Sequence, residues 1–98
     1  MEYQSKLKRE EIDELYDAIL SLENREECYR FFDDICTINE INSIAQRLQV
    51  AKLLSQKKTY NEIEAITKAS TATISRINKC LTYGADGYKI VLERLDKE

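Results

Sequence analysis

Apolar residues recur at three- and four-residue steps along most of this 98-residue chain, and no proline interrupts them. Steps of that length bring side chains to one face of an α-helix. The chain has only two glycines, Gly84 and Gly87, and is rich in Leu, Ile, Ala, Glu and Lys, which favour helices. The sequence therefore predicts an all-α protein in which residues 1–98 form one domain.

Capping patterns divide the chain into six expected helices. An Asn or Thr followed three residues later by Glu marks a helix start, and this pattern occurs at Asn24, Thr37 and Thr59. Ser70 or Thr71 is expected to cap the fifth helix, and a loop over residues 83–88 contains both glycines. The expected helices span about residues 5–22, 25–36, 38–56, 60–68, 71–81 and 88–96.

Two of these helices carry long apolar stripes. The first has Ile12, Leu15, Ile19 and Leu22, and the third follows a near-heptad pattern of Ile41, Ile44, Leu48, Ala51 and Leu54. The second is expected to bury Cys28, Phe31, Phe32 and Ile35. Because the remaining short helices cannot cover both stripes within one chain, the pattern predicts a homodimer. A compact monomeric bundle is the alternative.

Several functional classes are disfavoured by composition. The chain has no His, and its three cysteines, Cys28, Cys36 and Cys80, form no CxxC pair, so neither a metal site nor a cofactor is expected. The absence of His also removes the commonest general base, and adjacent acids such as Asp33 and Asp34 point apart on a helix, so we expect no catalytic residues and no enzyme. No apolar run is long enough for a membrane span, and no secretory signal is visible, which predicts a cytoplasmic location. The three cysteines are therefore expected to be buried, reduced thiols.

The formal net charge of −3 hides a division along the chain. Residues 1–43 carry a net −7, residues 44–82 a net +5 and residues 83–98 a net −1. Phosphate attraction acts over roughly a Debye length, about 8 Å at physiological salt, so local charge matters more than the total. The basic middle segment is therefore suited to nucleic acid.

That basic segment contains a candidate helix-turn-helix at about residues 59–82. Ile63 would face inward from its first helix, Ala69 would lie in the turn, and Ile74 and Ile77 would anchor the second helix. Small residues at the start of this second helix would let it approach base edges in the major groove. We expect base or phosphate contacts from Ser70, Thr71, Ala72, Thr73, Ser75 and Arg76, and backbone contacts from Lys57, Lys58, Lys68 and Lys79.

Two positions depart from the common helix-turn-helix pattern. Glu64 stands where Ala usually lets the two helices touch, and Lys68 stands at the turn position usually held by Gly. Lys68 is therefore expected to adopt a positive φ. One alternative is an ordinary helical hairpin with solvated Lys and Thr. Another is a helical adaptor that binds protein through the acidic segment 1–43 and exposed Tyr3, Tyr16 and Tyr29.

Residues 35–95 resemble the Trp repressor superfamily, and in particular its YerC/YecD-like branch. The resemblance is carried by Ala45-Gln46-Arg47-Leu48, Val50-Ala51-Lys52-Leu53-Leu54, Tyr60-Asn61-Glu62-Ile63, the stretch from Ala69 to Arg76, Asn78-Lys79-Cys80-Leu81, Tyr83-Gly84 and Gly87-Tyr88. It implies an intertwined, six-helix homodimer whose fourth and fifth helices read a palindromic DNA operator. It also implies DNA contacts from Tyr60 and Asn61. We expect a repressor rather than an activator on steric grounds, because a small dimer acts most simply by occupying DNA.

The resemblance further implies an effector pocket, although tryptophan itself fits poorly. One of the two arginines that hold the indole in the Trp repressor matches Arg76, and a pocket threonine matches Thr73. The other arginine falls at Gln46 or Arg47. Ile77 stands where the family has a small glycine, and Cys80 replaces a serine. We therefore expect either another small-molecule effector or none.

Overall fold

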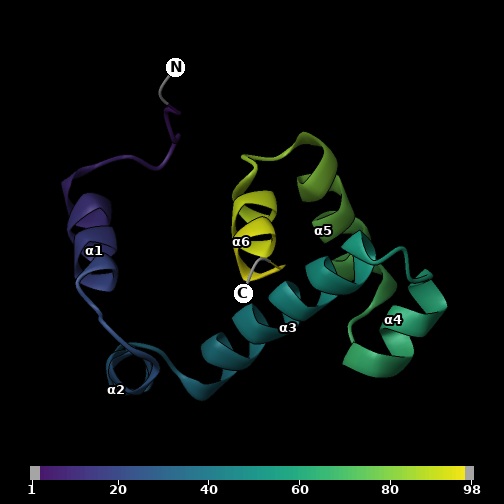
Figure 1. The fold of residues 1–98 in the computed structure, drawn as a ribbon, viewed down its shortest axis with the longest axis horizontal. Helices are drawn as coiled ribbons and strands as arrows, with labels where there is room; N and C mark the ends of the chain where they lie inside the picture. The colour runs from purple at the N-terminus through teal and green to yellow at the C-terminus, as the bar shows by residue number, and fades with distance from the viewer. Residues whose placement is uncertain (1–2, 97–98) are drawn as a thin grey trace. The chain divides into compact units, whose positions relative to one another are not determined.

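The computed structural model describes residues 3–96, which contain six α-helices and no β-strand. The helices are α1 (Glu10–Leu20), α2 (Arg25–Ile35), α3 (Ile38–Ser55), α4 (Tyr60–Thr67), α5 (Thr71–Tyr83) and α6 (Gly87–Asp96) (Figure 1). The chain groups into two units, residues 1–38 and residues 39–98. The predicted all-α class and the number and order of the helices are confirmed.

The largest error in the predicted boundaries is at the first helix, which begins at Glu10 and not near Ser5. The Ser5 hydroxyl accepts a hydrogen bond from the amide of Leu7 (3.0 Å) and so stabilises a turn. Serine competes in this way with helical hydrogen bonding. At the other end, the hydroxyl of Ser21 donates to the carbonyl oxygen of Ala18 (2.6 Å), and α1 ends at Leu20.

In the first unit, side chains of α1 and α2 are at most half-buried. The predicted α1 stripe is half-buried, and in α2 the rings of Phe31 and Phe32 meet edge to face with centroids 5.4 Å apart. The prediction that Cys28 and Ile35 are buried is wrong for the single chain, because both are exposed. The Asn24 cap is confirmed, since its side chain accepts from the Glu27 amide at 2.9 Å.

The second unit contains the buried core. Val50 and Ala51 of α3, Ile63 of α4, Ala69 of the α4–α5 turn, and Ile74 and Ile77 of α5 form this core. Tyr88 and Leu92 of α6 pack against it. The core lies at the C-terminal half of α3, around which α4 and α5 gather (Figure 1).

The α5–α6 connection is shorter than predicted. Helix α5 continues to Tyr83 and α6 begins at Gly87, so only residues 84–86 lie outside the helices. Gly84 has an ordinary negative φ, but a Cβ there would lie 2.4 Å from the carbonyl oxygen of Cys80. Glycine is therefore required for the close approach of the backbone rather than for a left-handed conformation.

Candidate nucleic-acid interface

The candidate helix-turn-helix is built on the anchors that the sequence predicts. Ile63, Ala69, Ile74 and Ile77 are all at most 2% exposed. Packing α4 against α5 removes these apolar side chains from water, and this burial holds the two helices together. Glu64 is exposed, so its carboxylate is not buried between the helices and the departure from Ala is tolerated.

Both helices of this pair start with the predicted caps. The Thr59 hydroxyl accepts from the amide of Glu62 (3.1 Å), and the Glu62 carboxylate accepts from the amide of Thr59 (2.9 Å), which completes the capping box. The backbone hydrogen bond from Thr59, with a smaller effect of its side chain, lowers the pKa of Glu62. Ser70, and not Thr71, caps α5 by accepting from the amide of Thr73.

The turn between α4 and α5 adopts the predicted left-handed conformation. Lys68 has φ 63° and ψ 13°, and its amide donates to the carbonyl oxygen of Glu64. Lys57, which precedes α4, also has a positive φ of 65°. Two of the lysines predicted to contact DNA thus occupy a backbone conformation that glycine would adopt at lower cost.

Thr67 connects the turn to the two helices beside it. Its buried hydroxyl donates to the carbonyl oxygen of Ile63 (2.8 Å) and accepts from the amide of Ala69 (3.1 Å). Its own carbonyl oxygen accepts from the Gln46 side-chain amide of α3 at 3.0 Å. Sequence patterns did not reveal this network, because a Thr near the end of a short helix is an unremarkable residue.

Most of the predicted DNA contacts lie at the surface of this unit. Among them, the exposed residues are Lys57, Lys58, Asn61, Lys68, Ser70, Thr71, Ala72, Ser75, Arg76 and Lys79. Thr73 is half-buried, and its hydroxyl accepts from that of Ser70 (3.1 Å). Tyr60 is also half-buried, and its phenolic oxygen accepts from the side-chain amide of Asn78 (3.2 Å), which links α4 to α5. The roles of these residues in binding DNA stay predictions.

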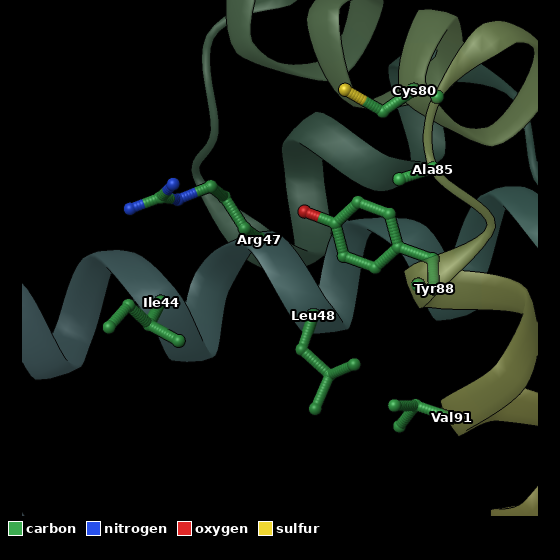
Figure 2. A pocket seen from close by; sticks show the side chains of 9 residues that line it. Ile44, Arg47, Leu48, Cys80, Ala85, Tyr88 and Val91 are labelled. Carbon is green, nitrogen blue, oxygen red and sulfur yellow. The ribbon is translucent and has the colours of Figure 1, made fainter. Parts of the chain in front are cut away.

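A mostly apolar cavity of about 610 Å³ lies between α3 and the start of α6. Its lining residues are Ile44, Arg47, Leu48, Cys80, Gly84, Ala85, Gly87, Tyr88 and Val91. Figure 2 shows the Tyr88 ring above α3, with its hydroxyl directed toward Arg47. Desolvation raises the pKa of Tyr88, and the positive charge of Arg47 partly opposes this.

Two of the six predicted effector residues, Arg47 and Cys80, line this cavity. Gln46 instead bonds to the turn at Thr67, and Ile77 lies in the core. Thr73 and Arg76 of α5 are not among the lining residues. The four-residue spacing of Ile44 and Leu48 on α3 was visible in the sequence. That they line the same cavity as Tyr88 and Val91 depends on how α6 packs back on α3.

Three other features of residues 3–96, the part of the chain that the structure describes, are the arrangement of potential metal ligands, the exposure of the thiols and the hydropathy of the helices. No group of three or more Cys, Asp or Glu side chains there is placed to hold a metal ion. Cys28 and Cys80 are exposed and Cys36 is half-buried, so the expectation of buried thiols is wrong for the single chain. No described helix is long and apolar enough to cross a membrane.

Comparisons with known proteins agree on one family. The family model for the Trp repressor protein matches residues 10–96. The uncharacterized protein YerC of Bacillus subtilis is 59% identical over 90 residues, which cover 92% of this chain and 86% of YerC.

Solved structures give the same result. The crystal structure of a Trp repressor candidate from Staphylococcus aureus matches with a TM-score of 0.89 and 58% identity, covering 95% of this chain and 93% of that one. A TrpR-like protein from Eubacterium eligens matches with a TM-score of 0.90 and 55% identity, covering 93% of this chain and 94% of that one. Family and fold are those of DNA-binding regulators and not of an enzyme. The resemblance read from the sequence is confirmed, and the chain belongs to the Trp repressor family.

Proposed function

We propose that this protein is a sequence-specific DNA-binding transcription regulator, and that it represses by occupying a palindromic operator as a homodimer. The observation that carries the proposal is the exposed N-terminal face of α5, which presents Thr71, Ala72, Ser75 and Arg76 above the buried anchors Ile74 and Ile77. Small side chains beside one arginine suit close approach to base edges. A small protein of this kind acts most simply by blocking access to the DNA it covers.

The lysines around α4 would supply the backbone contacts. Lys57 and Lys58 precede this helix and Lys68 follows it, and all three are exposed. Contacts from lysine to phosphate fix the position of a protein on the duplex without reading sequence. They also make affinity fall as salt rises, because bound counterions are released.

A second copy of the chain is proposed to cover the apolar face of α3 and α6. Ile44 is 52% exposed, Leu48 38%, Ile90 45% and Val91 44%. Three of these residues, Ile44, Leu48 and Val91, border the same cavity, so the exposed surface is continuous. Monomeric proteins rarely leave a large continuous apolar surface in water. Two copies related by a two-fold axis would place two helix-turn-helix units on one palindrome.

Substitution of Arg76 tests the DNA-reading role. A preferred site is first selected from random DNA and its affinity is then measured by fluorescence anisotropy at several salt concentrations. If Arg76 reads a base, Arg76→Ala should cost about 1–3 kcal/mol on the preferred site and relax the preference at one position. As the matched control, Lys57→Ala should weaken all sequences about equally and reduce the salt slope by about 1.

The proposal would be overturned if the wild-type protein showed no sequence preference and Arg76→Ala left binding unchanged. Weak DNA binding together with a stable complex with another protein would favour the adaptor alternative. Tyr3, Tyr16 and Tyr29, which are exposed in the single chain, would be available for such a complex.

Replacing Lys68 by Gly should change stability and DNA affinity in opposite directions. Removing a side chain from a left-handed position relieves about 1–2 kcal/mol, while the added flexibility of glycine costs about 0.5–1 kcal/mol. The free energy of unfolding should therefore rise by about 0.5–1 kcal/mol. Loss of one phosphate contact should weaken DNA binding and lower the salt slope by about 1.

Urea denaturation at fixed protein concentration measures the stability change, and Lys58→Gly is the matched control. Lys58 carries the same charge but is not among the residues with a positive φ. This control should lose a similar amount of DNA affinity without gaining stability. If Lys68→Gly were destabilised as much as Lys58→Gly, the left-handed turn would not be a source of strain.

A further inference from the structure

The helix-turn-helix is held together internally by both apolar and polar contacts. Ile63 of α4 packs with Ile74 and Ile77 of α5 in the buried core. The side chains of Asn78 and Tyr60 add a hydrogen bond of 3.2 Å between the same two helices. Helices α4 and α5 therefore form one packed unit, called the reading head below.

The apolar contact between the reading head and α3 holds the head in place and sets its approximate angle through the fit of the side chains. Val50 and Ala51 make its fully buried part, and the partly buried Leu53 and Leu54 of α3 also pack against this core. Contacts of this kind are non-directional, because their free energy depends mainly on the area removed from water. A directional bond between the head and α3 would therefore restrain the angle further.

The hydrogen bond from Gln46 to Thr67 is directional and joins α3 to the turn of the reading head. The Gln46 side-chain amide donates to the Thr67 carbonyl oxygen at 3.0 Å, across 21 residues of sequence. The Thr67 hydroxyl in turn bonds to the backbone of Ile63 before the turn and of Ala69 after it. Any movement of the head along α3 would lengthen or bend the bond between Gln46 and Thr67, and hydrogen bonds weaken steeply with angle. The two bonds of the Thr67 hydroxyl lie within the head and hold the Thr67 carbonyl oxygen in place as the acceptor.

We propose that Gln46 and Thr67 are positioning residues for DNA reading, and that their hydrogen bonds set the angle of the reading head on α3. The inference rests on the proposed function, since it concerns how the heads of a dimer meet two half-sites. Neither residue touches DNA in this scheme. Without these hydrogen bonds, each head can still bind a single half-site, but the distance between the two heads is no longer held constant.

The test compares DNA affinities for three duplexes. One carries the selected palindrome, one carries it with two base pairs inserted between the half-sites, and one carries a single half-site. Gln46→Met removes the donor and keeps a side chain of similar length. In this variant the preference for the native spacing should fall about three- to tenfold, the change expected for one lost neutral hydrogen bond. Affinity for the single half-site should stay within about twofold of wild type.

Three further variants separate positioning from folding. Gln49→Met makes the same change at an exposed position of α3 and should keep the spacing preference. Thr67→Val keeps the shape of Thr67 but removes the hydroxyl, and should lose the preference as Gln46→Met does. Thr67→Ser restores the hydroxyl and should recover it. Equal losses on all three duplexes would indicate general destabilisation and overturn the proposal.

A measurement without DNA keeps this inference distinct from the proposed function. Residual dipolar couplings of backbone amides report the orientation of α4 and α5 relative to α3. In the wild type one alignment should fit all three helices, whereas in Gln46→Met the reading head should show a reduced degree of order. An unchanged fit would overturn the positioning role. If wild-type protein instead showed a fixed head but no sequence preference, the proposed function would fail while the anchoring of the head would stand.

Discussion

Replacing Ile44 by Glu should convert the proposed homodimer into monomers. Ile44 is 52% exposed in the single chain, so a carboxylate there is compatible with the fold of that chain. In a dimer that covers the α3–α6 face, the same carboxylate would be buried without a partner, and the two-fold axis would bury it twice. Each burial costs several kcal/mol, so the dimer dissociation constant should rise by about a hundredfold or more.

Sedimentation equilibrium measures this change directly. Wild-type protein should sediment at twice the chain mass of 11.5 kDa, and Ile44→Glu at that mass itself. Loss of the dimer should also lower the affinity for the operator, because two linked heads bind far more tightly than one. Gln49→Glu adds the same charge at an exposed position of the same helix and should remain dimeric. A dimeric Ile44→Glu would show that the second copy binds elsewhere.

The largest loss of stability is expected for Ile74→Ala. The Ile74 side chain is 0% exposed and lies in the core between α3, α4 and α5. Truncating a fully buried isoleucine to alanine costs about 2–5 kcal/mol, because transfer energy is lost and a cavity is left. Domains of this size have a total stability of about 5–15 kcal/mol, so the loss is a large fraction of it.

Ile66→Ala is the matched control for this measurement. Ile66 lies on α4 with 52% of its surface exposed, so the same chemical change should cost less than about 1 kcal/mol. Urea denaturation followed by circular dichroism, at one protein concentration for all variants, compares the two. Equal losses would mean that the described core is not the centre of stability.

Local signals predicted the helices well because capping and periodicity act over a few residues. The Thr59–Glu62 capping box, the Asn24 cap and the left-handed turn at Lys68 all occur as predicted. The errors in the helix boundaries lie at helix ends, which are the least sharply defined parts of a helix. Ser5 forms a turn of its own and delays α1 to Glu10, while α5 passes Leu81 and ends at Tyr83.

The candidate site was only partly visible in the sequence. The anchors Ile63, Ala69, Ile74 and Ile77 followed from spacing, and all are buried. Gln46 and Arg47 could not be told apart in the sequence as effector residues. The structure separates them, since Gln46 bonds to Thr67 while Arg47 lines the cavity beside Tyr88. Neighbours on a helix point about 100° apart, so a shift of one residue assigns a side chain to a different surface.

By itself, the sequence determined the six helices, the basic middle segment and the membership of the Trp repressor family, because these depend on local spacing, charge and motif. Only the tertiary structure decided which residues meet across long separations. It placed Gln46 of α3 against the turn at Thr67, and it brought Ile44 of α3 and Val91 of α6 into the lining of one cavity. Such contacts depend on the angles at which helices pack, and those angles are set by the combined shape of many side chains rather than by any short stretch of sequence.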